Sequence, residues 1–210
     1  MKEQRQSLIE VLNDLSKEQL IGIIDELAKK DSILKSRLLL MYSKETTGQE
    51  LGNFKVLVRS IVNKHKGRQD FISYREVNDF ASELGECLVQ IEECPDPVVA
   101  LELAFFLLEE AIEAFQYTDD SDGDIGCLAE DTLEMIEVIV TNATGSEIGQ
   151  RQELFEKLLN QSEHPMFEEW EEYQITLLKI CTHLADSEEY RESLSRKVES
   201  MIDENTSHYY

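Results

Sequence analysis

The chain has 210 residues, a formal net charge of −24, 41% hydrophobic residues, and only 3 Pro and 9 Gly. This length suits one large domain or two small ones, and the hydrophobic share argues against a chain that is disordered throughout. The longest apolar run, residues 97–108, is interrupted by Glu102 and is shorter than the ~20 residues that a transmembrane helix needs. We therefore expect a soluble, cytoplasmic protein that does not enter a membrane.

The first seventy residues show the apolar spacing of short helices. Apolar residues recur at helical intervals in residues 8–15, 20–27, 34–41 and 54–61. Ser16 is followed three residues later by Gln19, the pattern of a capping box at a helix start, and Asp31 can cap the next helix. A polar break over residues 43–52 precedes the fourth segment, which we expect to end at the basic run before Gly67.

Longer helices are predicted after residue 71. Ser73 can open a segment with Glu76 at the capping-box position, and its apolar residues continue to Ile91. Pro97 suits a first helical turn, and the helix expected over 98–115 is apolar on most sides, as a central helix would be. Further apolar stripes indicate helices ending near Asn142, around 154–159, over 173–184 and over 194–201.

These elements predict an all-α protein. No segment alternates with a period of two over the length of a strand, so we expect no sheet. The helices from residue 73 onward recur in pairs of roughly forty residues, a cadence typical of antiparallel helical hairpins stacked as an α-solenoid, in a tetratricopeptide-like geometry. We predict an N-terminal short-helix region at 1–70 that is a cap or a small subdomain, an acidic helical-repeat domain at 71–204, and a frayed tail at 205–210.

Charge is distributed unevenly along the chain. Residues 1–70 hold 13 Lys and Arg against 10 Asp and Glu, whereas residues 71–210 hold 7 against 34, and no Lys or Arg occurs between Glu76 and Gln150. A field of that sign repels phosphates, which argues against direct nucleic-acid binding. The acids either keep the surface soluble or form a docking surface for a basic partner. The basic residues Lys55, Arg59, Lys64, Lys66 and Arg68 could touch phosphates, but neutralising nearby acids is the simpler interpretation.

The string Asp119-Asp120-Ser121-Asp122-Gly123-Asp124 is the most distinctive short motif. Clustered oxygens suggest a calcium loop, but with Gly123 at the sixth position of an EF-hand loop the first falls on Thr118 and the twelfth on Ala129. Asp and Ser also cap helices, and Gly permits a tight reversal, so a turn between two helices is the favoured interpretation. A contact with a partner remains the other alternative.

No catalytic motif is found, and we predict no catalytic residue, no cofactor and no metal. The four cysteines form no C-x-x-C pair, and no Walker A, G-x-S-x-G or G-x-G-x-x-G sequence occurs. Carboxylate pairs at four-residue spacing are common, as chance predicts in a chain with 44 acids.

Residues 74–143 resemble a bacterial domain of unknown function that accompanies SWIM-type zinc fingers. The resemblance rests on Tyr74, Val77 and the run Asp79-Phe80-Ala81, on the helix from Leu101 to Ile112, and on the aspartate string. The opening helices, with Leu15-Ser16-Lys17-Glu18-Gln19-Leu20, look like the start of the same family. The resemblance implies a helical-repeat fold associated with zinc-finger proteins, although the C-x-C and C-x-H pairs of the zinc module are absent here.

The leading hypothesis is a non-catalytic helical-repeat scaffold that binds a basic protein partner. We expect the partner surface to include Tyr74, Asp79, Asp119, Asp120, Ser121 and Asp122. The first alternative is an acidic nucleic-acid mimic that blocks a nucleic-acid-binding protein. The second is a metal-dependent enzyme that uses the turn at 119–124.

Overall fold

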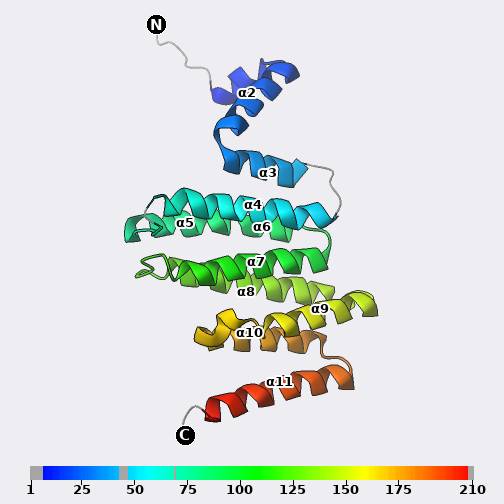
Figure 1. Ribbon diagram of the computed structural model, residues 1–210. Helices are drawn as coiled ribbons and strands as arrows, with labels where there is room; N and C mark the ends of the chain where they lie inside the picture. Colours follow the sequence, from blue (N-terminus) through cyan, green and yellow to red (C-terminus); the bar gives the residue numbers. More distant parts are fainter. Residues whose placement is uncertain (1–6, 43–46, 69, 208–210) are drawn as a thin grey trace. The chain divides into compact units, whose positions relative to one another are not determined.

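The computed structural model describes residues 7–42, 47–68 and 70–207, and within these ranges the chain is helical without any strand (Figure 1). The all-α prediction is therefore confirmed. The described residues fall into two compact units, Met1–Ser60 and Ile61–Tyr210. No helix in the described ranges is both long enough and apolar enough to cross a membrane.

The N-terminal unit contains α1 (Leu8–Asn13), α2 (Lys17–Lys30), α3 (Ser32–Tyr42) and the first part of α4 (Thr47–Lys66). The predicted capping box at α2 is confirmed, because Gln19 N–H donates to Ser16 Oγ and Ser16 N–H donates to Gln19 Oε1. Asp31 caps α3 by accepting from two backbone N–H groups at 2.9 and 3.0 Å. Of the predicted polar break at 43–52, residues 43–46 lie outside the described residues, and α4 already begins at Thr47.

Helix α2 forms where the sequence predicts it, but its apolar face is largely exposed. The apolar stripe at residues 20–27 forms the expected helix, yet no residue of α2 is buried, and Ile24 and Leu27 are 46% and 51% exposed. Among the described residues of the N-terminal unit, α3 is the main helical neighbour of α2, and it covers only part of the apolar face of α2.

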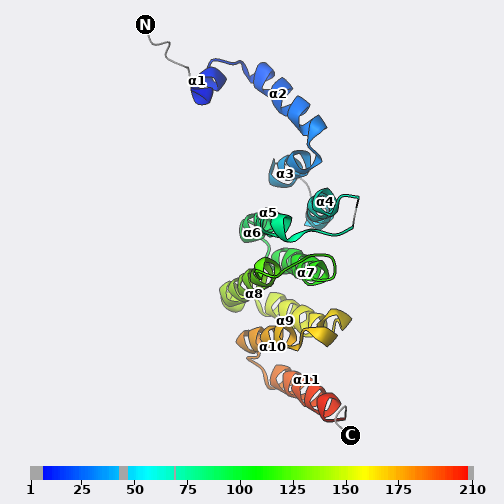
Figure 2. The ribbon, with the colours of Figure 1, turned by 90° about the vertical axis from the view of Figure 1, so that its left-hand side faces the viewer.

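In its described part, the C-terminal unit contains seven α-helices after the end of α4. They are α5 (Tyr74–Gly85), α6 (Cys87–Glu92), α7 (Pro97–Ala114), α8 (Asp124–Asn142), α9 (Ile148–Gln161), α10 (Glu171–Cys181) and α11 (Glu188–Ser207). Figures 1 and 2 show α7 beside α8 and α9 beside α10, with α5, α8 and α10 in one layer and α7 and α9 in the other. Short 3₁₀ turns follow α8, α9 and α10. The predicted tail at 205–210 is helical as far as Ser207, and residues 208–210 lie outside the described part.

Helix α7 is the centre of the C-terminal unit, as its all-round apolar sequence predicts. Leu101, Ala104, Leu107 and Leu108 are fully buried, and α7 packs against α6, α8 and α9. Asp96 caps its first turn, and Pro97 occupies the first helical position, where its missing N–H costs no hydrogen bond. Burial on several sides fixes the hairpin that α7 makes with α8.

The segment predicted as one helix up to Ile91 is two helices. Helix α5 ends at Gly85 and α6 starts at Cys87, with only Glu86 between them. The apolar face continues across this short break, because Leu84, Cys87 and Ile91 are all buried at helical spacing. Leu88 is only half-buried. The predicted box at Ser73 is also incomplete: Ser73 Oγ donates to Glu76 Oε2 at 2.7 Å and makes no side-chain bond to the helix backbone.

Candidate functional site

The aspartate string forms the turn between α7 and α8. Gly123 adopts a left-handed conformation with φ 81°, which reverses the chain directly before α8. The carboxylate of Asp120 then accepts hydrogen bonds from the backbone N–H groups of Ile125 at 2.9 Å and Gly126 at 3.2 Å. These are donors that the first turn of a helix leaves unpaired, so Asp120 stabilises the start of α8.

The same turn is bound to the start of α5. Tyr74 donates its hydroxyl hydrogen to Asp122 Oδ2 at 2.6 Å, and Asn78 donates from Nδ2 to Asp124 Oδ1 at 3.0 Å. Just before α5, Ile72 exchanges backbone hydrogen bonds with the chain around Thr118, forming an isolated parallel bridge. The turn is therefore held at both its backbone and its side chains.

Five of the six predicted partner residues lie in this turn or bond to it. Asp119, Ser121 and Asp122 are exposed, Tyr74 is 50% exposed, and Asp120 is half-buried as a helix cap. Ser121 Oγ donates to Asp119 Oδ1 at 2.5 Å. Asp79 is exposed on α5, directly after Asn78, and is the only predicted residue without a hydrogen bond to this turn in the described part of the chain.

Electrostatics extend the site to α8 and α10. The hydrogen bond to Asp122 raises the pKa of Tyr74, and the negative charges of Asp122, Asp119 and Asp124 raise it further. Burial raises the pKa of Tyr173 on α10, and nearby carboxylates, among them Glu172, Glu130 and Asp120, add to it. We define the acidic loop surface as Tyr74, Asp79, Asp119, Ser121, Asp122, Glu130 and Glu172.

Sequence reasoning missed the aromatic residues beside this surface. Trp170 stacks on Phe115 with ring centroids 4.2 Å apart, and on Tyr173 with centroids 5.6 Å apart. These rings fasten the region before α10 to the end of α7. The spacing of Trp170 and Tyr173 was a visible signal, but the partner Phe115 lies 55 positions earlier in the chain and belongs to another hairpin.

The carboxylates of the turn are occupied by protein donors. Asp120 caps α8, Asp122 accepts from Tyr74, and Asp124 accepts from Asn78. Among the residues that the structure describes, no group of three or more His, Cys, Asp or Glu side chains is arranged to hold a metal ion. The geometry supports the interpretation of this string as a turn between two helices.

Basic residues at the end of α4 contact groups of the same unit. Lys64 and His65 both bond Glu83 Oε2 at 2.7 Å, and the Lys66 ammonium lies 3.5 Å from the centroid of the Tyr117 ring. The interpretation of these cations as partners for nearby groups is confirmed for Lys64, which neutralises an acid. Lys66 makes a cation–π contact with Tyr117, and it forms no ion pair with the acids that the structure describes.

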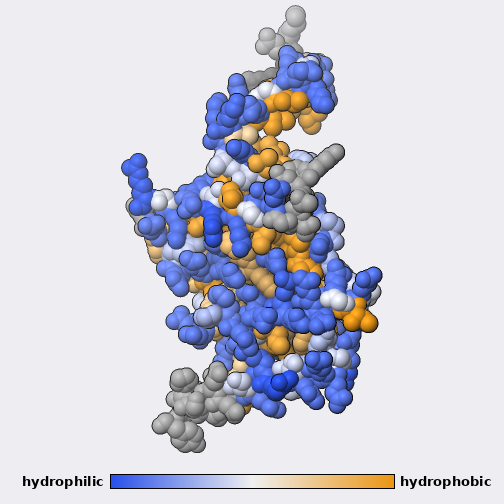
Figure 3. Space-filling model, turned by 45° about the vertical axis from the view of Figure 1, so that its right-hand side comes forward, coloured by the Kyte–Doolittle hydropathy of each residue, from blue (hydrophilic) through white to orange (hydrophobic). Residues whose placement is uncertain are grey.

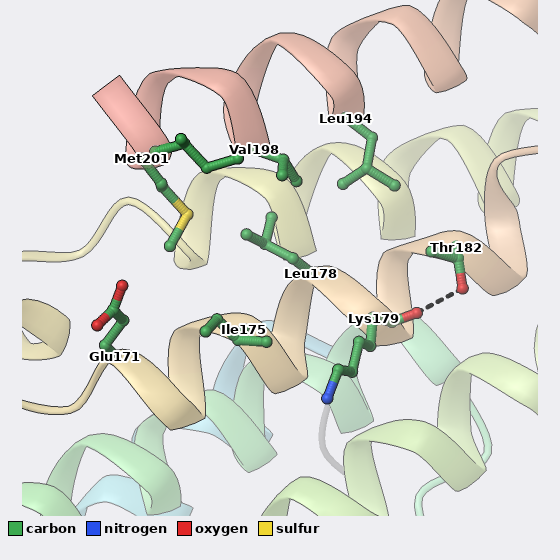
Figure 4. Close-up of a pocket in the computed structure, with 9 residues that line it drawn as sticks. Glu171, Ile175, Leu178, Lys179, Thr182, Leu194, Val198 and Met201 are labelled. Atoms are coloured by element: carbon green, nitrogen blue, oxygen red, sulfur yellow. Dashed lines mark hydrogen bonds between the residues drawn. The ribbon is translucent and has the colours of Figure 1, made fainter. Parts of the chain in front are cut away.

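A second candidate site is an apolar groove of about 340 Å³ between α10 and α11. Ile175 and Leu178 of α10 face Leu194, Val198 and Met201 of α11 across it (Figure 4). The two helices leave part of their apolar faces open, since Val198 is 40% exposed. Glu171 and Lys179 are its charged lining residues, so its charge does not select a particular ligand.

Comparison with protein-family models, with curated proteins and with solved structures gave no match for this chain.

Proposed function

We propose that this chain is a non-catalytic helical-repeat scaffold that binds a basic protein through the acidic loop surface. The observation that carries the proposal is the exposed Tyr74 ring, which is fixed by Asp122 among carboxylates. A fixed aromatic ring beside carboxylates suits Arg and Lys side chains, which pair with the acids and stack on the ring. The family resemblance to a domain that accompanies SWIM zinc-finger proteins belongs to the same proposal.

A repeat arrangement is part of this proposal. The antiparallel pairs α7–α8 and α9–α10 lie in two layers, with α5 preceding α8 in the same layer, and this is the neighbour relationship expected of stacked hairpins in a tetratricopeptide-like solenoid. Such stacks present the residues of successive helices on one continuous face. That geometry would bring Asp79 of α5, Glu130 of α8 and Glu172 of α10 to one side.

Charge supplies the specificity in this proposal. No Lys or Arg occurs from Glu76 to Gln150, so the turn and all of α8 present carboxylates without a competing cation of their own segment. A basic partner would be attracted over a distance set by ionic strength, and its binding would weaken with added salt. A neutral or acidic partner would show no such dependence.

The test is an affinity pull-down from native lysate with the whole chain, washed at low and then at high salt. A triple variant, Asp79→Asn, Asp119→Asn and Glu130→Gln, removes three charges from the acidic loop surface without touching Asp120 or Asp122. The matched control, Glu153→Gln, Glu189→Gln and Glu192→Gln, removes three charges from exposed positions on α9 and α11.

We expect a basic partner that elutes with salt, is lost with the triple variant and is kept by the control. Equal loss with both variants would mean that only overall charge matters, and retention by both would place binding elsewhere. The identity of the partner separates ordinary docking from nucleic-acid mimicry, because a mimic would capture a nucleic-acid-binding protein and compete with its nucleic acid.

A further inference from the structure

The N-terminal unit carries an apolar surface that its own helices leave open. Helices α2 and α3 form a groove of about 740 Å³, with a floor of Ile21, Ile24, Ala28, Leu38 and Leu39. Ile21 is 55% exposed and Leu39 is 47% exposed. Figure 3 shows hydrophobic surface, in orange, exposed among the N-terminal helices.

Helix α2 is well formed at both ends in spite of this exposure. It has a complete capping box at Ser16 and two lysines in its last turn, yet none of its residues is buried. An isolated helix of 14 residues is marginal in water, and most helices gain their stability from packing an apolar face. A ligand that covers Ile21 and Ile24 would supply the missing burial.

The rim of the groove is basic. Lys29, Lys30 and Lys35 line it together with a single acid, Asp25. Lys29 is paired with Asp25 at 2.5 Å, whereas Lys30 and Lys35 are exposed and form no ion pair among the described residues. Two ammonium groups are thus available beside an apolar floor, in a chain whose net charge is −24.

We propose that the α2–α3 groove binds an amphipathic α-helix of a partner protein whose apolar face is flanked by Glu or Asp. The residues Ile21, Ile24 and Ala28 follow the i, i+3, i+7 spacing that matches the apolar face of a third helix laid along the groove. Carboxylates on that helix would pair with Lys30 and Lys35. This proposal is independent of the acidic loop surface, which lies in the other unit and recognises the opposite charge.

The test measures fluorescence anisotropy of two designed helical peptides with the full chain. Both peptides are roughly 18 residues long, with leucines at helical i, i+3, i+4, i+7 spacing. One peptide has glutamates beside the leucine face, and the other has glutamines at the same positions. We expect the glutamate peptide to bind at least about fivefold more tightly than the glutamine peptide, although the negative net charge of the chain repels it.

Variants of α2 and α3 locate the binding. Ile21→Ala with Ile24→Ala removes apolar floor and keeps helix propensity, so both peptides should lose about tenfold or more in affinity. Ile23→Ala is the matched control, because Ile23 is 42% exposed on the same helix but does not line the groove. Lys30→Glu with Lys35→Glu should abolish the preference for glutamate, whereas Lys17→Glu should not.

Three results would overturn the proposal. The first is no binding of either peptide, and the second is equal binding of both, which would indicate an unselective apolar surface. The third is a chain that sediments as a dimer and becomes monomeric on Ile21→Ala with Ile24→Ala, because a second copy would then occupy the groove.

Discussion

The hydroxyl of Tyr74 and the carboxylate of Asp122 are joined by a 2.6 Å hydrogen bond across 48 positions of sequence. Tyr74 is the first residue of α5, and Asp122 lies in the turn before α8. Together with the bond between Asn78 and Asp124, this contact fixes the turn against α5, which lies in the same layer as α8. A rigid turn presents its other acids in one arrangement, which lowers the entropy that a partner must remove on binding.

Titration of Tyr74 tests this contact. Its pKa is raised above the ordinary value of 10.0 by the hydrogen bond to Asp122 and by the surrounding acids. The pKa of Tyr74 is higher in the folded state than in the unfolded state. Protonated Tyr74 therefore stabilises the fold at pH values below its unfolded-state pKa, and this stabilisation is lost as the pH rises through its folded-state pKa. The titration of Tyr74 can be isolated by subtracting the ultraviolet titration of Tyr74→Phe from that of the wild type. The midpoint of this difference should fall to lower pH when both proteins also carry Asp122→Asn. Asp131→Asn, on the exposed side of α8, should leave the midpoint unchanged.

Local signals were read correctly from the sequence because they depend on residues a few positions apart. The capping box at Ser16, the cap at Asp31 and the first-turn position of Pro97 are all present as predicted. The turn at Gly123 belongs to the same class, since Asp, Ser and Gly favour a reversal wherever they occur together. Each of these features depends only on hydrogen bonds and backbone conformation within one or two helical turns, so neighbouring residues in the sequence determine it.

Tertiary relationships were not readable in the same way. The break at Glu86 could not be predicted from the apolar spacing, which continues smoothly from Leu84 through Cys87 to Ile91. The exposed stripe of α2 looks like a core face in sequence, because periodicity shows that a face is apolar but not that a neighbour covers it. The hydrogen bond from Tyr74 to Asp122 could not be predicted from the sequence, because predicting it requires knowing which helices are adjacent.

Substitution of Gly123 should separate backbone strain from packing. A Cβ at this position would meet no atom within 4 Å, so the cost of Gly123→Ala comes from its left-handed φ of 81° alone. We expect a loss of about 1 kcal/mol in the free energy of unfolding. Gly126→Ala is the control, because Gly126 lies inside α8, also without a neighbour within 4 Å, and should gain up to about 1 kcal/mol. A loss of the same size at both positions would contradict this explanation.

Glu83 should make the C-terminal unit less stable to unfolding at acidic pH. Burial opposes its ionisation, but hydrogen bonds from Lys64 and His65 outweigh burial and lower its pKa below 4.5. The stabilisation is therefore present above the unfolded pKa and is lost as pH falls through the folded one. Glu83→Gln should cost about 1 kcal/mol in urea unfolding near neutral pH, a modest value because Lys64 is largely exposed. At pH values below the folded-state pKa of Glu83, the wild type and Glu83→Gln should have the same free energy of unfolding. The control Glu134→Gln should have the stability of the wild type at every pH.

The stacking of Tyr190 on Phe155 should hold α11 against α9. The two ring centroids are 4.4 Å apart, and Lys197 of α11 adds an ion pair to Glu163 at 3.2 Å. A stacked pair contributes about 0.5–1.5 kcal/mol beyond its buried area. Tyr190→Leu should therefore raise the hydrogen exchange of α11 amides by up to about tenfold, with little change in α7. Tyr190→Phe keeps the ring and should behave as the wild type; faster exchange there would assign the effect to the hydroxyl.

Replacement of Asp120 decides between a helix cap and a metal ligand. Asp120 accepts from the N–H groups of Ile125 and Gly126, so Asp120→Ala should cost about 1 kcal/mol in the free energy of unfolding. Asp120→Asn keeps an accepting oxygen and should recover most of that loss. The same proteins titrated calorimetrically with calcium, magnesium and manganese should release no heat of binding, because the turn's carboxylates already accept from protein donors. Saturable binding by the wild type that disappears in Asp120→Asn would instead make this carboxylate a ligand, since the amide preserves the cap but not the charge that a hard cation requires.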